Sequence, residues 1–516
     1  MTHPGAKTGS QIAVGVAHRM PIDPDVTAYQ PGGPAVEAGR LQAAIQCVND
    51  TLKQLEAGDS SGIYAVQELM FADMIVPLMD DVAHHDSAVH AVQARFAAAA
   101  EQLESIDDPY LKARAEDQRG LSRMVLRALM GQPITPGLAS GILIVDELDP
   151  LTASTIDPSR CQGVITIFGG ATGHGAIVAQ ARGVALLTGR PEAAEIVDGT
   201  LVAFDPVDHR LLVNPSPEQL TELNRQQAER QEKEDRAAQM AFQPGVTKSG
   251  KRVLVEGNVS AVVDAFEADK AGAEGCGLVR TEILFSKWQH APGAEEQAAL
   301  YVQIGEALHG RMVTIRTWDP GGDKPLPFIP QEPEANPMLG QRGIRAMQLM
   351  PELFDEQLKA ILLASRQVEV RVMFPMITQP FEMVWARARL AEVQAAVGGN
   401  IEAGMMVEVP SAALRASMFV SLADFISIGT NDLTQYTLAV DRGNPNVTAV
   451  AMGDDAAVYD LITMAATAFK GKPVAVCGDL ASRVDEVPRL IAAGATELSV
   501  RPPLVGVIKQ AVRESD

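Results

Sequence analysis

The sequence predicts a multidomain α/β protein whose C-terminal half is a (β/α)₈ barrel. Its 516 residues exceed what one ordinary core accommodates, and a content of 47% hydrophobic and 21% charged residues is typical of globular domains. Beyond Val246, short apolar strands alternate with longer helical stretches, which is the rhythm of repeated βα units. Before that point the sequence contains a long segment with helical spacing and short apolar strands on both sides of it, which indicates further domains.

Residues 34–131 are rich in Ala, Gln and charged residues at helical spacing and lack strand alternation, which predicts a helical subdomain. Short apolar strands flank this segment on both sides. They are predicted over 12–17, 140–145, 163–168, 185–187, 201–204 and 210–213. We therefore expect the helices to be inserted into one α/β domain formed by residues 1–33 and 132–214.

The stretch from Pro215 to Ala241 is polar, contains no glycine and offers opposite charges four residues apart. Such a pattern is typical of a solvated helix, so residues 215–245 are predicted to contain a linker helix. A charge run of this kind is more often a solvated face than a binding site.

The last predicted domain, residues 246–516, has the size of a (β/α)₈ barrel, whose active site gathers at the carboxyl ends of the strands. Its eight strands are predicted over 253–259, 277–280, 313–318, 370–376, 404–409, 425–429, 473–477 and 497–500.

Charge and cysteine content restrict the partners and the compartment. Sixty-five acidic and 43 basic residues give a net charge of −22, which repels nucleic acid and attracts a basic protein partner. The four cysteines lie far apart without a C-x-x-C pair, which argues against a zinc cage or a disulfide framework. We find neither a signal peptide nor a run of roughly 20 apolar residues. A cytoplasmic protein without membrane insertion is expected.

Polar residues cluster where the predicted barrel strands end. The cluster contains Arg280, Glu282, Arg316, Asp319, Lys324, Glu408, Asn431, Asp432, Arg442 and Cys477. Arginine forks match phosphate oxygens, and Mg²⁺ takes carboxylate oxygens while keeping waters. These residue types predict a divalent cation next to an anionic, phosphate-like substrate. The alternative is a set of structural ion pairs that cap the barrel.

A second candidate is His174, which follows a predicted strand and the glycine-rich turn 168–173 and begins a helix. A helix N-terminus favours neutral imidazole, a usable nucleophile, and afterwards offers N–H groups and a positive dipole end to a phosphoryl group. The alternative is a structural histidine in a turn, which is the common role of a lone histidine.

From about residue 11 to its C-terminus the chain resembles the phosphoenolpyruvate–protein phosphotransferases, Enzyme I of the bacterial sugar phosphotransferase system. The motifs that carry the resemblance lie at 277–285, 315–327, 336–345, 429–436 and 477–481. The resemblance implies a swivelling phosphohistidine domain, a helical subdomain that docks a histidine-containing phosphocarrier protein, and a homodimer formed through the barrels.

The resemblance also implies roles for individual residues in the first step of that system, with phosphoenolpyruvate (PEP) as substrate. His174 is the phosphorylated nucleophile, and Cys477 protonates the pyruvate enolate, since a thiol with a pKa near about 8.5 is mostly protonated at neutral pH. Glu408 and Asp432 ligate Mg²⁺. The residues that hold PEP or add charge near it are Arg280, Arg316, Asn431, Asp432, Arg442, Lys324 and Arg342.

The sequence departs from the family pattern in two places. The family usually has Gly-Gly-Arg-Thr-Ser-His before and at the nucleophile, but here Ala171 replaces the Arg and Gly173 replaces the Ser. The acidic pattern of the docking helices is missing around residues 71–81. The motifs therefore specify the reaction with PEP better than they specify which phosphocarrier protein accepts the phosphoryl group.

Two other functions remain open from the sequence. Pyruvate phosphate dikinases and PEP synthases resemble the phosphohistidine and barrel parts, but they carry a large ATP-binding domain before the histidine. Only 173 residues precede His174 here, without a P-loop glycine pattern. The other alternative is a weakly catalytic regulator that binds its partner according to its phosphorylation state.

Overall fold

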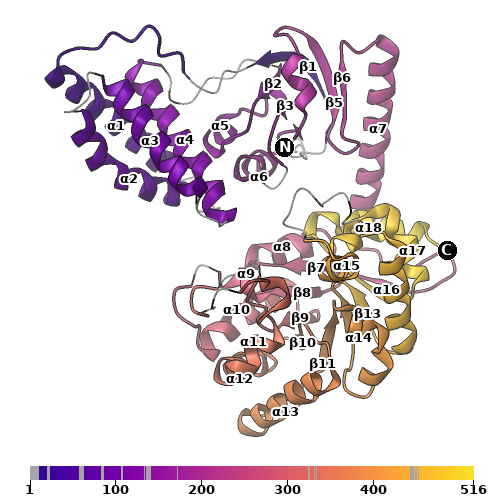
Figure 1. The fold of residues 1–516 in the computed structure, drawn as a ribbon. Helices are drawn as coiled ribbons and strands as arrows, with labels where there is room; N and C mark the ends of the chain where they lie inside the picture. The colour runs from indigo at the N-terminus through magenta and orange to yellow at the C-terminus, as the bar shows by residue number, and fades with distance from the viewer. Residues whose placement is uncertain are drawn as a thin grey trace. The chain divides into compact units, whose positions relative to one another are not determined.

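The computed structural model describes residues 11–516 except positions 20–23, 57–62, 83–86, 106–108, 133, 135–140, 171–172, 287, 323–325, 331, 333, 442–446, 448–449 and 451–452. The chain divides into two compact units, Met1–Arg230 and Gln231–Asp516 (Figure 1).

In the first unit, the chain forms a helical layer after strand β1 (Ala13–Arg19) and before strand β2 (Gly141–Val145). Its helices are α1 (Pro34–Glu56), α2 (Ile63–Val82), α3 (Ala88–Ser105) and α4 (Pro109–Leu129). They share an aliphatic core with few aromatic side chains, in which Leu41, Phe71 and Phe96 are fully buried. Glu37, also fully buried, ties the layer together, because its carboxylate accepts hydrogen bonds from the Ala88 N–H at the start of α3 and from the Tyr29 hydroxyl.

The α/β part of the first unit is a six-stranded sheet in the order β4-β3-β2-β1-β5-β6. Strands β1 to β4 pair in parallel, whereas β5 pairs antiparallel with both β1 and β6. The strands are β1 (Ala13–Arg19), β2 (Gly141–Val145), β3 (Cys161–Thr166), β4 (Leu186–Leu187), β5 (Leu201–Asp205) and β6 (Arg210–Val213). Each strand overlaps one predicted from its apolar run.

Strand β2 contributes to an apolar cluster on each face of this sheet, because alternate residues of a strand point to opposite sides. Leu143 and Val145 pack with the short helix α5 (Pro150–Thr155) and with α6 (His174–Ala181). Ile142 and Ile144 belong to the apolar cluster on the other face. His174 is thus the first residue of a helix that lies on the sheet.

The boundary between the two units falls within helix α7 (Pro217–Gln239). Its exposed face carries Arg225, which pairs with Glu222 and Glu229 one turn before and after it. The C-terminal end of α7 belongs to the second unit, in which Ala237 of α7 and Ala241 just after it are buried.

The second unit is a closed barrel of eight parallel strands, which confirms the predicted fold class (Figure 1). The strands are β7 (Leu254–Val259), β8 (Cys276–Arg280), β9 (Val313–Arg316), β10 (Val370–Phe374), β11 (Ala403–Val407), β12 (Ile426–Ile428), β13 (Val474–Val476) and β14 (Glu497–Val500). Helices surround it, the longer ones being α8 (Val262–Lys270), α10 (Ala294–Ala307), α12 (Pro351–Ala364), α13 (Pro380–Val397), α15 (Thr430–Leu438), α16 (Ala456–Ala468) and α18 (Val505–Glu514).

The interior of the barrel has an apolar layer above a charged floor. The apolar layer consists of Leu278, Met373, Met406, Phe425 and Cys477. In the floor, near the amino ends of the strands, the Arg371 guanidinium donates to Glu497 Oε2 at 2.7 Å and to Thr314 Oγ1 at 2.8 Å. Glu256 is buried beside them, and burial together with the charge of Glu497 raises its pKa to about 8. This charged floor was not predicted from the sequence.

Among the described residues, no helix combines the length and the apolarity needed to cross a lipid bilayer.

Candidate active site

The predicted barrel residues gather at the carboxyl ends of the strands because all eight strands point the same way. Arg280 and Arg316 are the last residues of β8 and β9. Glu408 follows β11 directly, and Cys477 follows β13. Asp432 lies in the first turn of α15, which follows β12.

Arg316 is buried and surrounded by acidic side chains. Its Nη2 pairs closely with Glu282 Oε1, and its Nη1 lies 3.6 Å from Asp319 Oδ2. Burial opposes the charge of Arg316, but these carboxylates outweigh it and raise its pKa. The side chain therefore presents a fixed positive charge at the end of β9, which suits an anionic ligand.

Arg342 joins two elements through a buried double ion pair. Its Nη2 lies 3.0 Å from Asp319 Oδ2 and its Nη1 lies 2.8 Å from Asp432 Oδ1. A third contact runs from Nη1 to the Tyr436 hydroxyl at 3.1 Å. Because Arg342 is fully buried, these contacts hold the first turn of α15 against the loop after β9.

Glu408 is a buried carboxylate in the same network. Its Oε1 accepts a hydrogen bond from the Met376 N–H at 2.7 Å. Met376 has a φ of 57°, an uncommon conformation for a non-glycine residue, and this strained backbone aims its N–H at Glu408. Burial and the charges of Asp432 and Asp319 raise the pKa of Glu408 to about 7. This crowding of carboxylates is the setting that a bound cation relieves.

Cys477 places a buried thiol in the apolar layer below these charges. Its Sγ donates to the Ile428 carbonyl at 3.6 Å. Burial raises the pKa of this thiol to about 11, although the nearby charges of Arg316 and Arg280 lower it. The thiol is therefore protonated at neutral pH and has a proton to donate.

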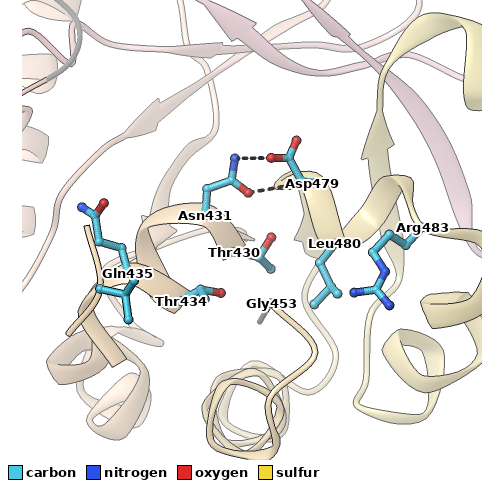
Figure 2. A pocket seen from close by; sticks show the side chains of 9 residues that line it. Thr430, Asn431, Thr434, Gln435, Gly453, Asp479, Leu480 and Arg483 are labelled. Carbon is cyan, nitrogen blue, oxygen red and sulfur yellow. Dashed lines mark hydrogen bonds between the residues drawn. The ribbon is translucent and has the colours of Figure 1, made fainter. Parts of the chain in front are cut away.

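Asn431 lies at the edge of the site beside Asp479, the first residue of a short 3-10 helix, η5 (Asp479–Ser482). Asn431 Nδ2 donates to Asp479 Oδ2 at 3.0 Å, and the Asp479 N–H donates to Asn431 Oδ1 at 2.8 Å. Both residues line a cavity of about 270 Å³ together with Thr430, Thr434, Gln435, Val440, Gly453, Leu480 and Arg483 (Figure 2).

For several of the predicted site residues the structure describes the position only in part or not at all. Arg442, Lys324 and Ala171 lie outside the described residues. His174 is placed as the first residue of α6 in the first unit, with Gly173 as its N-cap in extended conformation, but its side chain is not described. Arg280 is half-buried at the end of β8.

Three groups that shape the site were not predicted from the sequence. Met376 aims its N–H at Glu408, Tyr436 contacts Arg342, and Asp479 pairs with Asn431. Asp479 could have been found, because it stands two residues after Cys477 at a strand end. The other two roles depend on a backbone angle and on a contact between distant segments.

Family models match almost the whole chain. The PEP-binding domain of PEP-utilising enzymes matches residues 234–516, their N-terminal domain matches residues 4–114, and their mobile domain matches residues 138–208. The first of these alone covers more than half of the chain and includes every barrel residue described above.

Curated relatives show the same extent of similarity. A phosphoenolpyruvate-protein phosphotransferase of Geobacillus stearothermophilus is 33% identical over 96% of this chain and 90% of its own length. The protein of that name from Haemophilus influenzae is 35% identical over 80% of this chain and 74% of its own. A multiphosphoryl transfer protein of Rhodobacter capsulatus is 37% identical over 83% of this chain and 53% of its own.

Among solved structures, the N-terminal domain of Enzyme 1 - Nitrogen aligns with 43% of this chain and 97% of its own, at 24% identity and a TM-score of 0.33. A likeness of this size adds nothing to what the sequence comparisons establish.

Proposed function

The chain belongs to the family of PEP-utilising enzymes, and we propose that it transfers the phosphoryl group of PEP to its own His174 and then to a histidine-containing phosphocarrier protein. The comparisons confirm the family resemblance that the motifs indicated. By the same resemblance, this reaction is the first step of a sugar phosphotransferase system.

One observation carries the proposal: guanidinium, carboxylate, amide and thiol groups converge at one end of the barrel. PEP carries a phosphate, a carboxylate and a carbon that must accept a proton, and the site has a group suited to each. Arg280, Arg316, Asn431 and Arg442 are proposed to bind the two anionic groups, with Lys324 adding charge nearby. Arg342 is also proposed to add charge nearby, and its fully buried guanidinium holds Asp432 in place, because it lies between two aspartates.

Mg²⁺ fits the carboxylates of this site. Glu408 and Asp432 are proposed as its ligands, since their carboxylates are crowded together in a buried place, where burial and the charges of Asp432 and Asp319 raise the pKa of Glu408 to about 7. No group of three or more His, Cys, Asp and Glu side chains suited to a metal occurs among the described residues. Mg²⁺ needs only one or two carboxylates when substrate oxygens and waters complete its shell. When bound, the ion neutralises charge on the phosphate.

In the proposed reaction the imidazole of His174 attacks phosphorus, so that the P–N bond forms as the P–O bond to the enol oxygen breaks. Arg316 stabilises the charge on the transferring group because its own charge is fixed by Glu282 and Asp319. The enolate that leaves takes a proton at carbon from the Cys477 thiol and becomes pyruvate. Cys477 is suited to this role because its raised pKa keeps the proton in place.

His174 must then meet a second protein. We propose that the α/β domain swivels between the barrel and the carrier, and that the helices α1 to α4 dock the carrier. The net charge of −22 favours a basic partner surface. A homodimer formed through the barrels and a cytoplasmic location are part of the same proposal. Exposed apolar side chains on the barrel, among them Phe381 and Val384 of α13, support an association surface there.

The test is a comparison of phosphoryl donors. Purified protein is incubated with Mg²⁺, a histidine-containing phosphocarrier protein and either PEP or ATP. The phosphorylated form of the carrier and the pyruvate released are then quantified. We expect carrier phosphorylation from PEP with stoichiometric pyruvate and none from ATP. Transfer from ATP would support a dikinase, and PEP binding without transfer to any carrier would support a regulator.

A further inference from the structure

The side-chain amide of Asn431 is held in one orientation by the turn that follows Cys477. The Asp479 N–H donates to Oδ1 at 2.8 Å, and Nδ2 donates to the Asp479 carboxylate at 3.0 Å (Figure 2). An amide has nearly the same shape when its oxygen and nitrogen are exchanged, so its contacts decide which atom faces a ligand. The exchanged orientation would set oxygen against carboxylate and N–H against NH₂.

Asn431 follows β12 and Asp479 follows β13, and the turns after these two paired strands lie close together. The Cys477 N–H donates to the Ile428 carbonyl at 3.1 Å, which continues the pairing of β12 and β13. At the next residue, a Cβ on Gly478 would lie 1.9 Å from Thr430 Oγ1 and 2.8 Å from Asn431 Oδ1. Glycine at this position lets the Asp479 backbone come close enough to donate to Asn431.

We propose that Asp479 is a positioning residue for PEP binding, which holds Asn431 so that the second N–H of Nδ2 is presented to the phosphate of PEP. Nδ2 carries two hydrogens, and Asp479 takes one of them. The inference rests on the proposed function, because Asn431 matters in this way only if the barrel binds PEP.

Charge alone does not explain an aspartate at this place. A carboxylate next to an anion site repels the substrate, so its removal would tighten PEP binding if charge were its main effect. As a hydrogen-bond acceptor it orders the amide in advance, which lowers the entropy cost of binding. The two effects have opposite signs, and the affinity for PEP distinguishes them.

The experiment measures the dissociation constant of PEP by calorimetry with Mg²⁺ present, in a His174→Ala parent so that PEP is not consumed. We expect Asp479→Ala to weaken binding about three- to tenfold, the value of one hydrogen bond. Asp479→Asn keeps an acceptor oxygen and should stay within about twofold of the parent. Combined with Asn431→Ala, Asp479→Ala should add no further loss, because its effect passes through Asn431.

Unchanged or tighter binding by Asp479→Ala, or losses that multiply in the double variant, would overturn the proposal. Thermal unfolding of each variant identifies a loss that comes from misfolding, and in that case Asp479→Asn, which has the same shape, decides the matter. A parent that does not bind PEP would refute the proposed function itself, which is a different result from binding that is insensitive to Asp479.

Discussion

At the scale of single residues, burial keeps Cys477 in the protonated form that its proposed role needs. A general acid must hold its proton until the enolate forms, and burial raises the pKa of this thiol to about 11. Cys276 is an equally buried thiol for which we expect no role in the reaction. It lies at the opposite end of β8 from Arg280, away from the charges of the site.

Replacement of Cys477 by alanine should lower kcat for pyruvate formation from PEP about 10²- to 10⁴-fold, because the enolate loses its proton donor. The dissociation constant for PEP should change little, since the thiol is not expected to bind the phosphate or the carboxylate. Cys276→Ala removes an equally buried thiol and is the matched control, which should keep full turnover. Equal losses in the two variants would show that a core defect, rather than proton donation, explains the effect.

Glu256 allows a prediction about pH. Its pKa of about 8 lies above the ordinary value of 4.5. Between these two pH values the folded protein holds a proton that the unfolded chain has released. The free energy of unfolding therefore falls as pH rises through this range. Glu256→Gln should remove this contribution and make the variant more stable than the parent near about pH 9. Denaturant titrations from about pH 5 to pH 9 test this, and parallel curves for the two proteins would contradict it.

The residues of the site divide into those that the sequence could predict and those that it could not. Arg316, Glu408, Asp432 and Cys477 were predicted to gather because each stands at or just after a strand end. Their burial and pairing could not be predicted, since Asp319, Arg342 and Asp432 are joined only by the closed barrel.

At the scale of elements, apolar runs located all eight barrel strands but overestimated some of their lengths. The run 313–318 was predicted as one strand, whereas β9 ends at Arg316 because the chain then turns into the loop that carries Asp319. The apolar character continues past this end, since Trp318 is fully buried. An apolar run thus reports burial, while the end of a strand depends on where pairing with its neighbours stops.

Helix α6 should be sensitive to the size of its second residue. A Cβ on Gly175 would lie 1.9 Å from the Leu148 carbonyl oxygen, which is backbone and cannot turn away. Gly175→Ala should therefore displace α6, lower the stability by about 1–3 kcal/mol and slow phosphorylation of His174, while PEP binding to the barrel stays intact.

The control for this variant is Gly170→Ala in the same segment, where an added Cβ would meet nothing within 4 Å. Stability is measured by denaturant unfolding, and phosphorylation by a single-turnover assay. If Gly175→Ala behaved like Gly170→Ala in both assays, the inference that α6 packs tightly on the Leu148 backbone would be contradicted.

At the scale of the whole molecule, the division into two compact units falls inside α7, whereas the predicted barrel domain begins at residue 246. The barrel draws on residues before that point. The buried Lys509 ammonium donates to the Ala241 carbonyl at 2.9 Å and to the Gly272 carbonyl at 2.6 Å. The segment that follows α7 therefore contributes to the barrel domain, which the polar character of residues 215–245 did not indicate.

Two fragments test this dependence. A fragment of residues 231–516 should fold and bind PEP with Mg²⁺. A fragment of residues 246–516 loses one acceptor of a buried ammonium and should be less stable by about 1–3 kcal/mol. Thermal unfolding and PEP titration of both fragments measure the difference. Equal stability would show that the barrel domain begins at residue 246, as the sequence pattern predicted.

The central claim is that PEP phosphorylates this protein at His174. The most direct measurement incubates the purified protein with Mg²⁺ and labelled PEP and maps acid-labile phosphate in the parent and in His174→Ala. We predict label on His174 in the parent, its passage to an added phosphocarrier protein, and no label in the variant, which should still bind PEP. Label at another residue, or none at all although PEP is bound, would contradict the account.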